Sequence, residues 1–199
     1  MAKLKKKYLF LFIIVIVGFV VGILFSNILN NNDSKLVSTK IGEYFNNLAN
    51  DVPINYFRNL ITSIKNNIFY LVIIWVFGLS VIGLLFNNFI IFFKSFILGF
   101  SVGSIINIYL YSGLVLSFFY IFPALLINLF VLMMMTYYAN NLSLNIFNVI
   151  FRKKDIKFSL ILKNYTKVLG IFAIILLISS IIETFIMPFF LKLFSFLIK

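Results

Sequence analysis

The chain has 199 residues, of which 63% are hydrophobic and 11% are charged, and its formal net charge at pH 7 is +12. A soluble domain would be about half apolar and about a quarter charged, so this composition excludes an ordinary soluble domain. The sequence contains no Cys and no His, which excludes disulfides, thiolate nucleophiles, imidazole bases and most transition-metal sites. We predict no metal, no cofactor and no catalytic residue.

The apolar residues come in blocks long enough to cross a bilayer, where roughly 20 residues span ~30 Å. Backbone groups in lipid must be paired within their own segment, and the blocks lack the alternation typical of barrel strands. We therefore predict an all-α, polytopic helical membrane protein with about five transmembrane helices and its N-terminus inside. Residues 1–199 are predicted to form a single membrane domain.

Residues 1–29 combine cytoplasmic lysines with the first span. Four lysines within Met1–Lys7 precede a nearly continuous apolar run, Tyr8–Leu29. This run is too long for the apolar region of a signal peptide, and no small-residue cleavage site follows it. The pattern predicts a transmembrane anchor with a cytoplasmic N-terminus. Gly18 and Gly22 form a weak packing motif on it.

Residues 30–66 are predicted to form an external amphipathic segment. Apolar residues recur at helical spacing on both sides of Pro53, which breaks a helix. We expect two short amphipathic helices on the membrane surface or against a partner. The candidate partner surface consists of Tyr44, Phe45, Phe57 and Leu60. The alternative is a lid that packs on the protein's own helices.

Residues 67–138 are predicted to hold spans two to four. Two apolar runs flank the polar pair Asn87-Asn88, where a turn would produce a membrane hairpin. Small residues permit close helix approach in lipid, and asparagine can add an interhelical hydrogen bond. Four residues spaced four apart form such a helix-packing stripe, namely Ser95, Gly99, Gly103 and Asn107.

Three further features of this region carry expectations. Lys94 lies about six residues, roughly 9 Å, into the third predicted span, so we expect its side chain to snorkel to the cytoplasmic headgroups. Residues 109–114 are predicted to form a short external turn. Pro123 lies in the fourth predicted span, about Val115–Tyr138, and predicts a kink there.

Residues 139–166 are predicted to be a cytoplasmic basic loop, and residues 167–199 the fifth span and tail. Five basic residues in the loop oppose one acid, Asp155, which fits the positive-inside pattern. A short helix is expected on the inner leaflet, with its cations toward anionic lipid. The net charge therefore reflects topology, and no nucleic-acid binding is predicted. Pro188 is expected to end the fifth span.

Glu183 is the one carboxylate within a predicted span. Intramembrane acids usually face the protein interior or a cavity, so we predict a buried polar contact formed by Glu183 and Ser180. Two alternatives remain: a partner contact or an ion or proton site, and an acid near the outer helix end that is hydrogen-bonded or wetted. A proton pump is not expected, because Lys94 is the only other charge available for a relay.

Residues Gly99–Gly103 match the G-x-S-x-G pattern of a nucleophile elbow. That chemistry needs a strand-to-helix turn and a general base, usually His. Here the pattern lies within an apolar span of a chain without His. The interpretation as an intramembrane protease is therefore nearly excluded.

Several motifs resemble those of the stage II sporulation protein M family. They are GLSVIG at residues 78–83, KSFILGFSVG at 94–103, the span with Pro123, and IIETFIMP at 181–188. The resemblance covers nearly the whole chain. It implies a multi-pass protein of the bacterial cell membrane without catalysis of its own. It also implies a complex with stage II sporulation proteins D and P, the peptidoglycan-degrading enzymes that thin the septal wall during engulfment.

The first hypothesis is therefore a membrane scaffold that recruits cell-wall hydrolases in the mother-cell septal membrane. The alternative is a small membrane transporter or permease subunit, which Pro123 and the charges within the spans favour. The absence of a visible inverted repeat counts against this alternative. Lipid is the remaining expected partner, and the sequence makes no prediction of oligomeric state.

Overall fold

A computed structural model describes residues 2–49, 55–121, 124–152 and 158–193, and these parts of the chain fold into helices joined by short turns. The elements in chain order are α1 (Ala2–Ser26), α2 (Asn31–Ala49), α3 (Tyr56–Gly78), α4 (Gly83–Ile121), α5 (Ala124–Arg152), α6 (Phe158–Ile181), the π-helix η1 (Ile182–Ile186) and α7 (Met187–Leu193).

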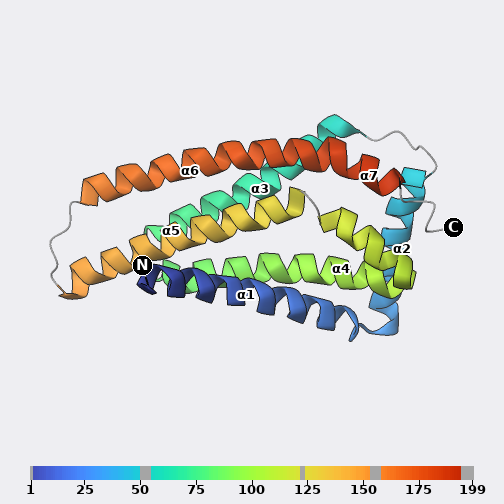
Figure 1. The fold of residues 1–199 in the computed structure, drawn as a ribbon, viewed down its shortest axis with the longest axis horizontal. Coiled ribbons are helices and arrows are strands. Elements are labelled where there is room, and N and C mark those ends of the chain that lie inside the picture. Colours follow the sequence, from blue (N-terminus) through green and yellow to red (C-terminus); the bar gives the residue numbers. More distant parts are fainter. Residues whose placement is uncertain (1, 50–54, 122–123, 153–157, 194–199) are drawn as a thin grey trace.

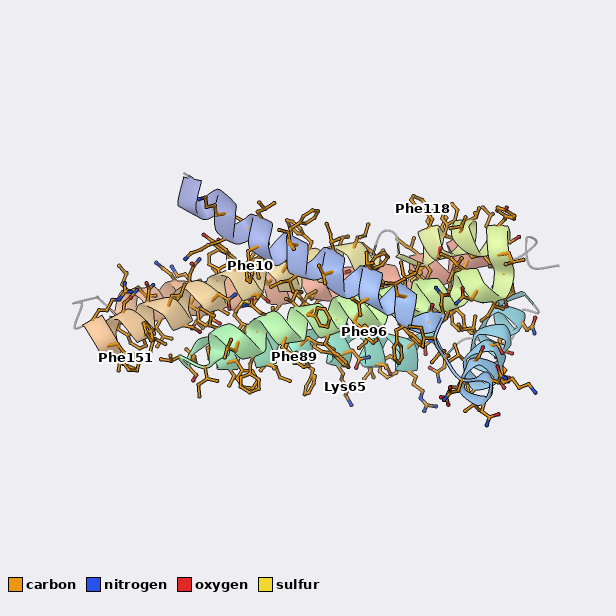
Figure 2. All side chains as sticks on the ribbon, turned by 90° about the horizontal axis from the view of Figure 1, so that it is seen from below. Phe10, Lys65, Phe89, Phe96, Phe118 and Phe151 are labelled. Carbon is orange, nitrogen blue, oxygen red and sulfur yellow. The ribbon has the colours of Figure 1, made fainter. Side chains whose placement is uncertain are left out.

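The described residues include five helical segments long and apolar enough to cross a membrane, which confirms the predicted polytopic helical architecture. Figure 1 shows α1, α3, α4, α5 and α6 running along the long axis, with α2 across one end. Aromatic side chains such as Phe89 and Phe118 point away from the bundle (Figure 2). An apolar outer surface of this kind is expected where lipid replaces water as the solvent.

The core has two parts. The larger cluster lies between α3, α4, α5 and α6 and includes Leu71, Ile91 and Leu132. The smaller cluster lies beneath α2 and joins Phe45 to Ile105, Leu116, Met187 and Leu191. Helix α2 is therefore packed onto the end of the bundle.

The hairpin turn lies between α3 and α4, at residues 79–82, and the prediction of a turn at Asn87-Asn88 is wrong. Ser80 organises the turn, because its carbonyl accepts from the Gly83 N–H at 3.2 Å and its hydroxyl accepts from the Ile82 N–H at 3.3 Å. A Cβ at position 83 would collide with the carbonyl oxygen of Phe77. Asn88 instead lies within α4, where its side-chain oxygen accepts a hydrogen bond from Asn140 at 2.7 Å.

The chain reverses direction at Leu110, within the turn expected at residues 109–114. Leu110 has φ 51° and ψ −123°, a left-handed backbone conformation inside the long element α4. Residues 111–121, which we call the return segment, fold back from there toward α5 (Figure 1). Gly113 permits this reversal, because a Cβ there would lie 2.6 Å from the carbonyl oxygen of Ile105.

The described residues of the predicted fourth span, 115–138, lie in the return segment and in α5. The first ends at Ile121 and the second begins at Ala124. Pro123, for which a kink is predicted, lies outside the described residues. The kink expected at Pro123 therefore stays a prediction.

The region predicted as a cytoplasmic loop, 139–166, is mostly helix, because α5 continues to Arg152 and α6 begins at Phe158. These residues pack on the end of α3. The Ser143 hydroxyl donates to the Gly78 carbonyl at 3.2 Å, and the Tyr165 hydroxyl donates to the Trp75 carbonyl at 3.0 Å. The predicted separate helix on the inner leaflet is thus the last part of α5.

The external segment and the fifth span also differ from expectation. Asn55 caps α3 by accepting from the Arg58 N–H at 3.0 Å, and α3 then runs without a break to Gly78. The second predicted amphipathic helix is therefore the start of a span. Pro188 does not end the last span, which continues to Leu193. In a regular helix its ring would strike the Thr184 carbonyl, but Thr184 lies in the wider turn of η1.

Candidate functional site

The polar residues within the bundle meet at the carboxylate of Glu183. Its Oε2 accepts hydrogen bonds from the Ser63 hydroxyl at 2.7 Å and from the side-chain amides of Asn67 and Asn128, each at 3.3 Å. These donors come from α3 and α5, whereas Glu183 belongs to η1. One carboxylate oxygen thus connects three elements. These hydrogen bonds are partly buried, and burial strengthens a hydrogen bond because the surroundings screen charge weakly.

A second set of bonds holds this centre in place. The Asn67 amide also donates to the Ser180 hydroxyl at 3.0 Å, and Ser180 donates to the Leu176 carbonyl at 2.9 Å. Thr184 donates to the Ser180 carbonyl at 2.8 Å. Both hydroxyl residues are buried. Ser180 therefore lies beside Glu183 in one network, although it does not itself bond to the carboxylate.

Two irregular backbone features lie beside the carboxylate. Glu183 sits in η1, and π-helical turns are found frequently at functional sites. The N-terminus of α5 is buried in the bundle, where the Ala124 carbonyl accepts a hydrogen bond from Ser179 at 3.0 Å. Asn128 lies one turn further along α5. Discontinuous membrane helices place half-helix ends at the binding sites of many transporters.

Lys94 is deeper than the sequence predicts. Because α4 begins at Gly83, Lys94 lies eleven residues into the helix, or about 16 Å at 1.5 Å per residue. Its Nζ lies 4.3 Å from the ring centroid of Tyr70, a cation–π contact of the kind that gains strength away from water. The Lys94 ammonium group therefore lies over a ring of α3, and its expected snorkelling to the cytoplasmic headgroups stays a prediction.

Sequence reasoning missed the roles of Ser63, Asn67 and Asn128. A signal was present for the first two, because they fall on one face of α3 with three other residues. The buried face of this helix consists of Ser63, Asn67, Leu71, Ile74 and Gly78. In a membrane the polar side of a helix turns inward, so Ser63 and Asn67 should have been paired with Glu183.

The small-residue stripe of α4 lies against α1. A Cβ at Gly99 would collide with the carbonyl oxygen of Phe19, and one at Gly103 with the Ser26 hydroxyl. Conversely, a Cβ at Gly18 would lie 2.6 Å from the Phe92 carbonyl oxygen. Glycines on both helices therefore bring the two backbones close together, as in other small-residue contacts in lipid.

Two polar members of the stripe flank these glycines. Ser95 is buried and donates to the Ile91 carbonyl at 2.8 Å. The side-chain amide of Asn107 donates to the Ser26 carbonyl at 3.3 Å and to the Ser26 hydroxyl at 3.2 Å. The α1–α4 contact thus includes an interhelical hydrogen bond at the C-terminal end of α1.

The family model of stage II sporulation protein M matches residues 11–188, which include part of every span. The chain belongs to this family. The resemblance carried by the sequence motifs is therefore confirmed, and the protein is a sporulation-related, multi-pass membrane protein. No curated protein and no solved structure matches the chain.

In this member of the stage II sporulation protein M family, the predicted partner surface is only partly exposed. Phe57 is 73% exposed, Tyr44 is 42% exposed and Leu60 is half-buried. Phe45 is 1% exposed and meets Tyr109 edge to face at 5.5 Å. Phe45 belongs to the protein's own core, so the prediction that it is part of an exposed docking surface is wrong.

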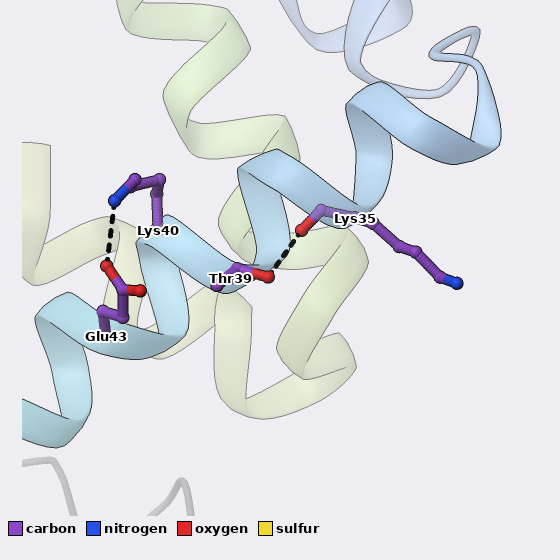
Figure 3. Close-up of polar contacts among 4 residues, drawn as sticks. All are labelled: Lys35, Thr39, Lys40 and Glu43. Carbon is purple, nitrogen blue, oxygen red and sulfur yellow. Dashed lines mark hydrogen bonds and ion pairs between the residues drawn. The ribbon is translucent and has the colours of Figure 1, made fainter.

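The outward side of α2 is polar. Thr39 donates to the Lys35 carbonyl at 2.9 Å, and Lys40 pairs with Glu43 at 3.1 Å (Figure 3). This exposed ion pair contributes little to stability. Partial burial, together with the charges of Tyr120 and Glu183, raises the pKa of Tyr44 to about 12. The Tyr44 hydroxyl is therefore a neutral hydrogen-bond donor on α2.

The described residues contain no group of acidic side chains that could hold a metal ion. Ser101, the serine of the G-x-S-x-G pattern, donates to the Ile97 carbonyl at 3.0 Å within α4. It lies on a continuous helix rather than on a strand-to-helix turn.

Proposed function

We propose that this chain is a membrane scaffold that anchors and recruits peptidoglycan-degrading enzymes at the septal membrane during engulfment. Its partners are stage II sporulation proteins D and P, by the resemblance of the motifs described above. The family match over residues 11–188 carries the proposal. The scaffold itself performs no catalysis.

The arrangement of the outer end supports this role. The external helix α2 is fixed on the bundle through Phe45, so it presents its polar side in a defined position. Phe57 stands exposed at the first turn of α3. A rigid surface with an exposed aromatic anchor is a suitable docking site, because aromatic residues often dominate binding energy at interfaces.

Co-purification from the native host tests this proposal. The tagged chain is isolated in mild detergent, and the co-purifying proteins are identified by mass spectrometry. Phe57→Ala should lose the hydrolase, whereas Phe69→Ala should keep it. Phe69 is a suitable control because it is also exposed on α3 but lies three turns further along the helix, in the span. Absence of any wall hydrolase from the wild-type eluate would refute the scaffold.

A second candidate function, a transporter or permease subunit, has a specific observation in its favour. The π-helix η1 carries Glu183, and Asn128 near the start of α5 donates to its carboxylate. Transporters place irregular helix segments around a charge in a similar way. Purified protein in liposomes should then carry a solute, and Glu183→Gln should abolish the flux. Wild-type liposomes that carry no more solute than empty ones would rule this candidate out.

A further inference from the structure

A small pocket lies between α1, α4 and α5, near the end of the bundle that holds the N-terminus. Its volume is about 220 Å³. The side chains with polar groups that line it are Lys6 and Lys7 from α1, Asn88 from α4, and Tyr137, Asn140 and Asn141 from α5. This pocket is separate from the Glu183 centre, and neither the scaffold nor the transporter hypothesis uses it.

The side chains of the pocket are arranged around positive charge. Lys7 donates to the Asn141 side-chain oxygen at 2.6 Å. The NH₂ group of Asn141 therefore points away from Lys7 and remains a hydrogen-bond donor. No described residue accepts a hydrogen bond from Lys6. No acidic side chain lines the pocket among the described residues. The pocket therefore offers two cations and amide donors to an anion.

One buried acceptor adds a second requirement. Asn140 donates to Asn88 through its amide nitrogen at 2.7 Å. Its side-chain oxygen is buried and has no hydrogen-bond partner among the described residues. A buried acceptor without a partner costs free energy. When the Asn140 side chain turns toward the pocket, a ligand that bears a hydroxyl group as well as a negative charge can satisfy this oxygen.

The position of the pocket in the membrane identifies the source of such a ligand. The positive-inside rule assigns this end of the bundle to the cytoplasm. Basic pockets between transmembrane helices on that side bind anionic lipid headgroups. The exposed side chain of Phe10 and the half-buried side chain of Leu84 also line the pocket, and acyl chains can lie along them.

We propose that this pocket binds the headgroup of an anionic, hydroxyl-bearing phospholipid of the inner leaflet, of the phosphatidylglycerol type. Lys6 and Lys7 bind the phosphate through charge-assisted hydrogen bonds. The Asn140 side-chain oxygen accepts a hydrogen bond from a headgroup hydroxyl. The lipid thereby joins the end of α1 to α4 and α5.

Lipid binding to the purified full-length chain tests the proposal. Delipidated protein in neutral detergent is titrated with phosphatidylglycerol, phosphatidylcholine or inorganic phosphate, and the shift in thermal unfolding is measured. Lys6→Gln/Lys7→Gln should weaken the apparent affinity for phosphatidylglycerol by about 30-fold, the combined effect of two lysines at an anionic surface. The matched control is Lys163→Gln/Lys167→Gln, because these exposed lysines lie on α6 outside the pocket. It should change affinity by less than about threefold.

Phosphatidic acid separates the charge from the hydroxyl, because it has the phosphate but no headgroup glycerol. The wild type should prefer phosphatidylglycerol, and Asn140→Leu should lose this preference while keeping its preference over phosphatidylcholine. Three results overturn the proposal: equal shifts with phosphatidylglycerol and phosphatidylcholine, equal losses in both double variants, or an equal shift with inorganic phosphate. The last result would make the pocket a site for free phosphate.

Discussion

Replacing Gly99 by alanine tests whether close backbone contact holds α1 against α4. The added Cβ would lie 2.8 Å from the carbonyl carbon of Phe19 and 2.9 Å from its Cα, and closer still to the carbonyl oxygen. Ordinary contact begins near 3.4 Å, so the helices must separate by more than half an ångström. The obstacle is backbone, which cannot rotate away as a side chain can.

The expected cost follows from this displacement. Overpacking of one methyl group in a well-packed contact costs about 1–3 kcal/mol. Alanine also has a higher helix propensity than glycine, worth about 0.8–1 kcal/mol in the opposite direction. Gly170→Ala on α6 provides this gain alone, because no atom lies within 4 Å of a Cβ there. The difference between the two variants therefore isolates the packing cost.

Unfolding in mixed micelles measures this difference. Both variants are titrated with a denaturing detergent, and loss of helical signal is followed by circular dichroism. The free energy of unfolding should be about 1–3 kcal/mol lower for Gly99→Ala than for Gly170→Ala. Gly99→Val should lower it further. If Gly99→Ala proves as stable as Gly170→Ala, the two backbones are not in contact and the reasoning is wrong.

Three other changes probe different parts of the fold by the same assay. Glu183→Gln should lower the free energy of unfolding by about 1–3 kcal/mol, because the hydrogen bonds to Oε2 lose their charge. The control is Glu43→Gln, and an equal loss of stability in this variant would contradict the prediction. Leu110→Gly should stabilise the chain by about 1 kcal/mol by removing left-handed strain, and an equal gain in Leu110→Ala would show that strain is not the cause. Tyr165→Phe should cost about 1 kcal/mol, because the Trp75 carbonyl loses its donor; unchanged stability would mean that water replaces the hydroxyl.

The number of spans could be predicted from the sequence because it depends only on the length of each apolar block. The exact turns could not. Asn87-Asn88 looks like a loop signal, yet in lipid a polar pair can equally be a point of contact between helices. Asn88 meets Asn140, which is far away in the chain. The turn lies instead at residues 79–82 around Ser80. The composition of this stretch hardly differs from that of a membrane helix.

The candidate site was predictable only in part. Glu183 stands out because a carboxylate in a span is costly, but its donors are separated from it by 55 to 120 residues. No local pattern pairs residues across such separations. The burial of Phe45 illustrates the same limit, because helical periodicity identifies the apolar face of α2 but not the surface that covers it. The contact between α1 and α4 does have a local signal in the sequence, because glycines at a spacing of four on both helices already indicate close packing.

The positions of the two intramembrane charges also bear on how the protein is made. Tyr70 is synthesised before Lys94, so the ring that receives the ammonium group is already present when α4 enters the membrane. All three donors to Glu183 likewise precede it in the chain. Each charge therefore meets a partner that is already in place, and the last span can insert as the step that completes the bundle.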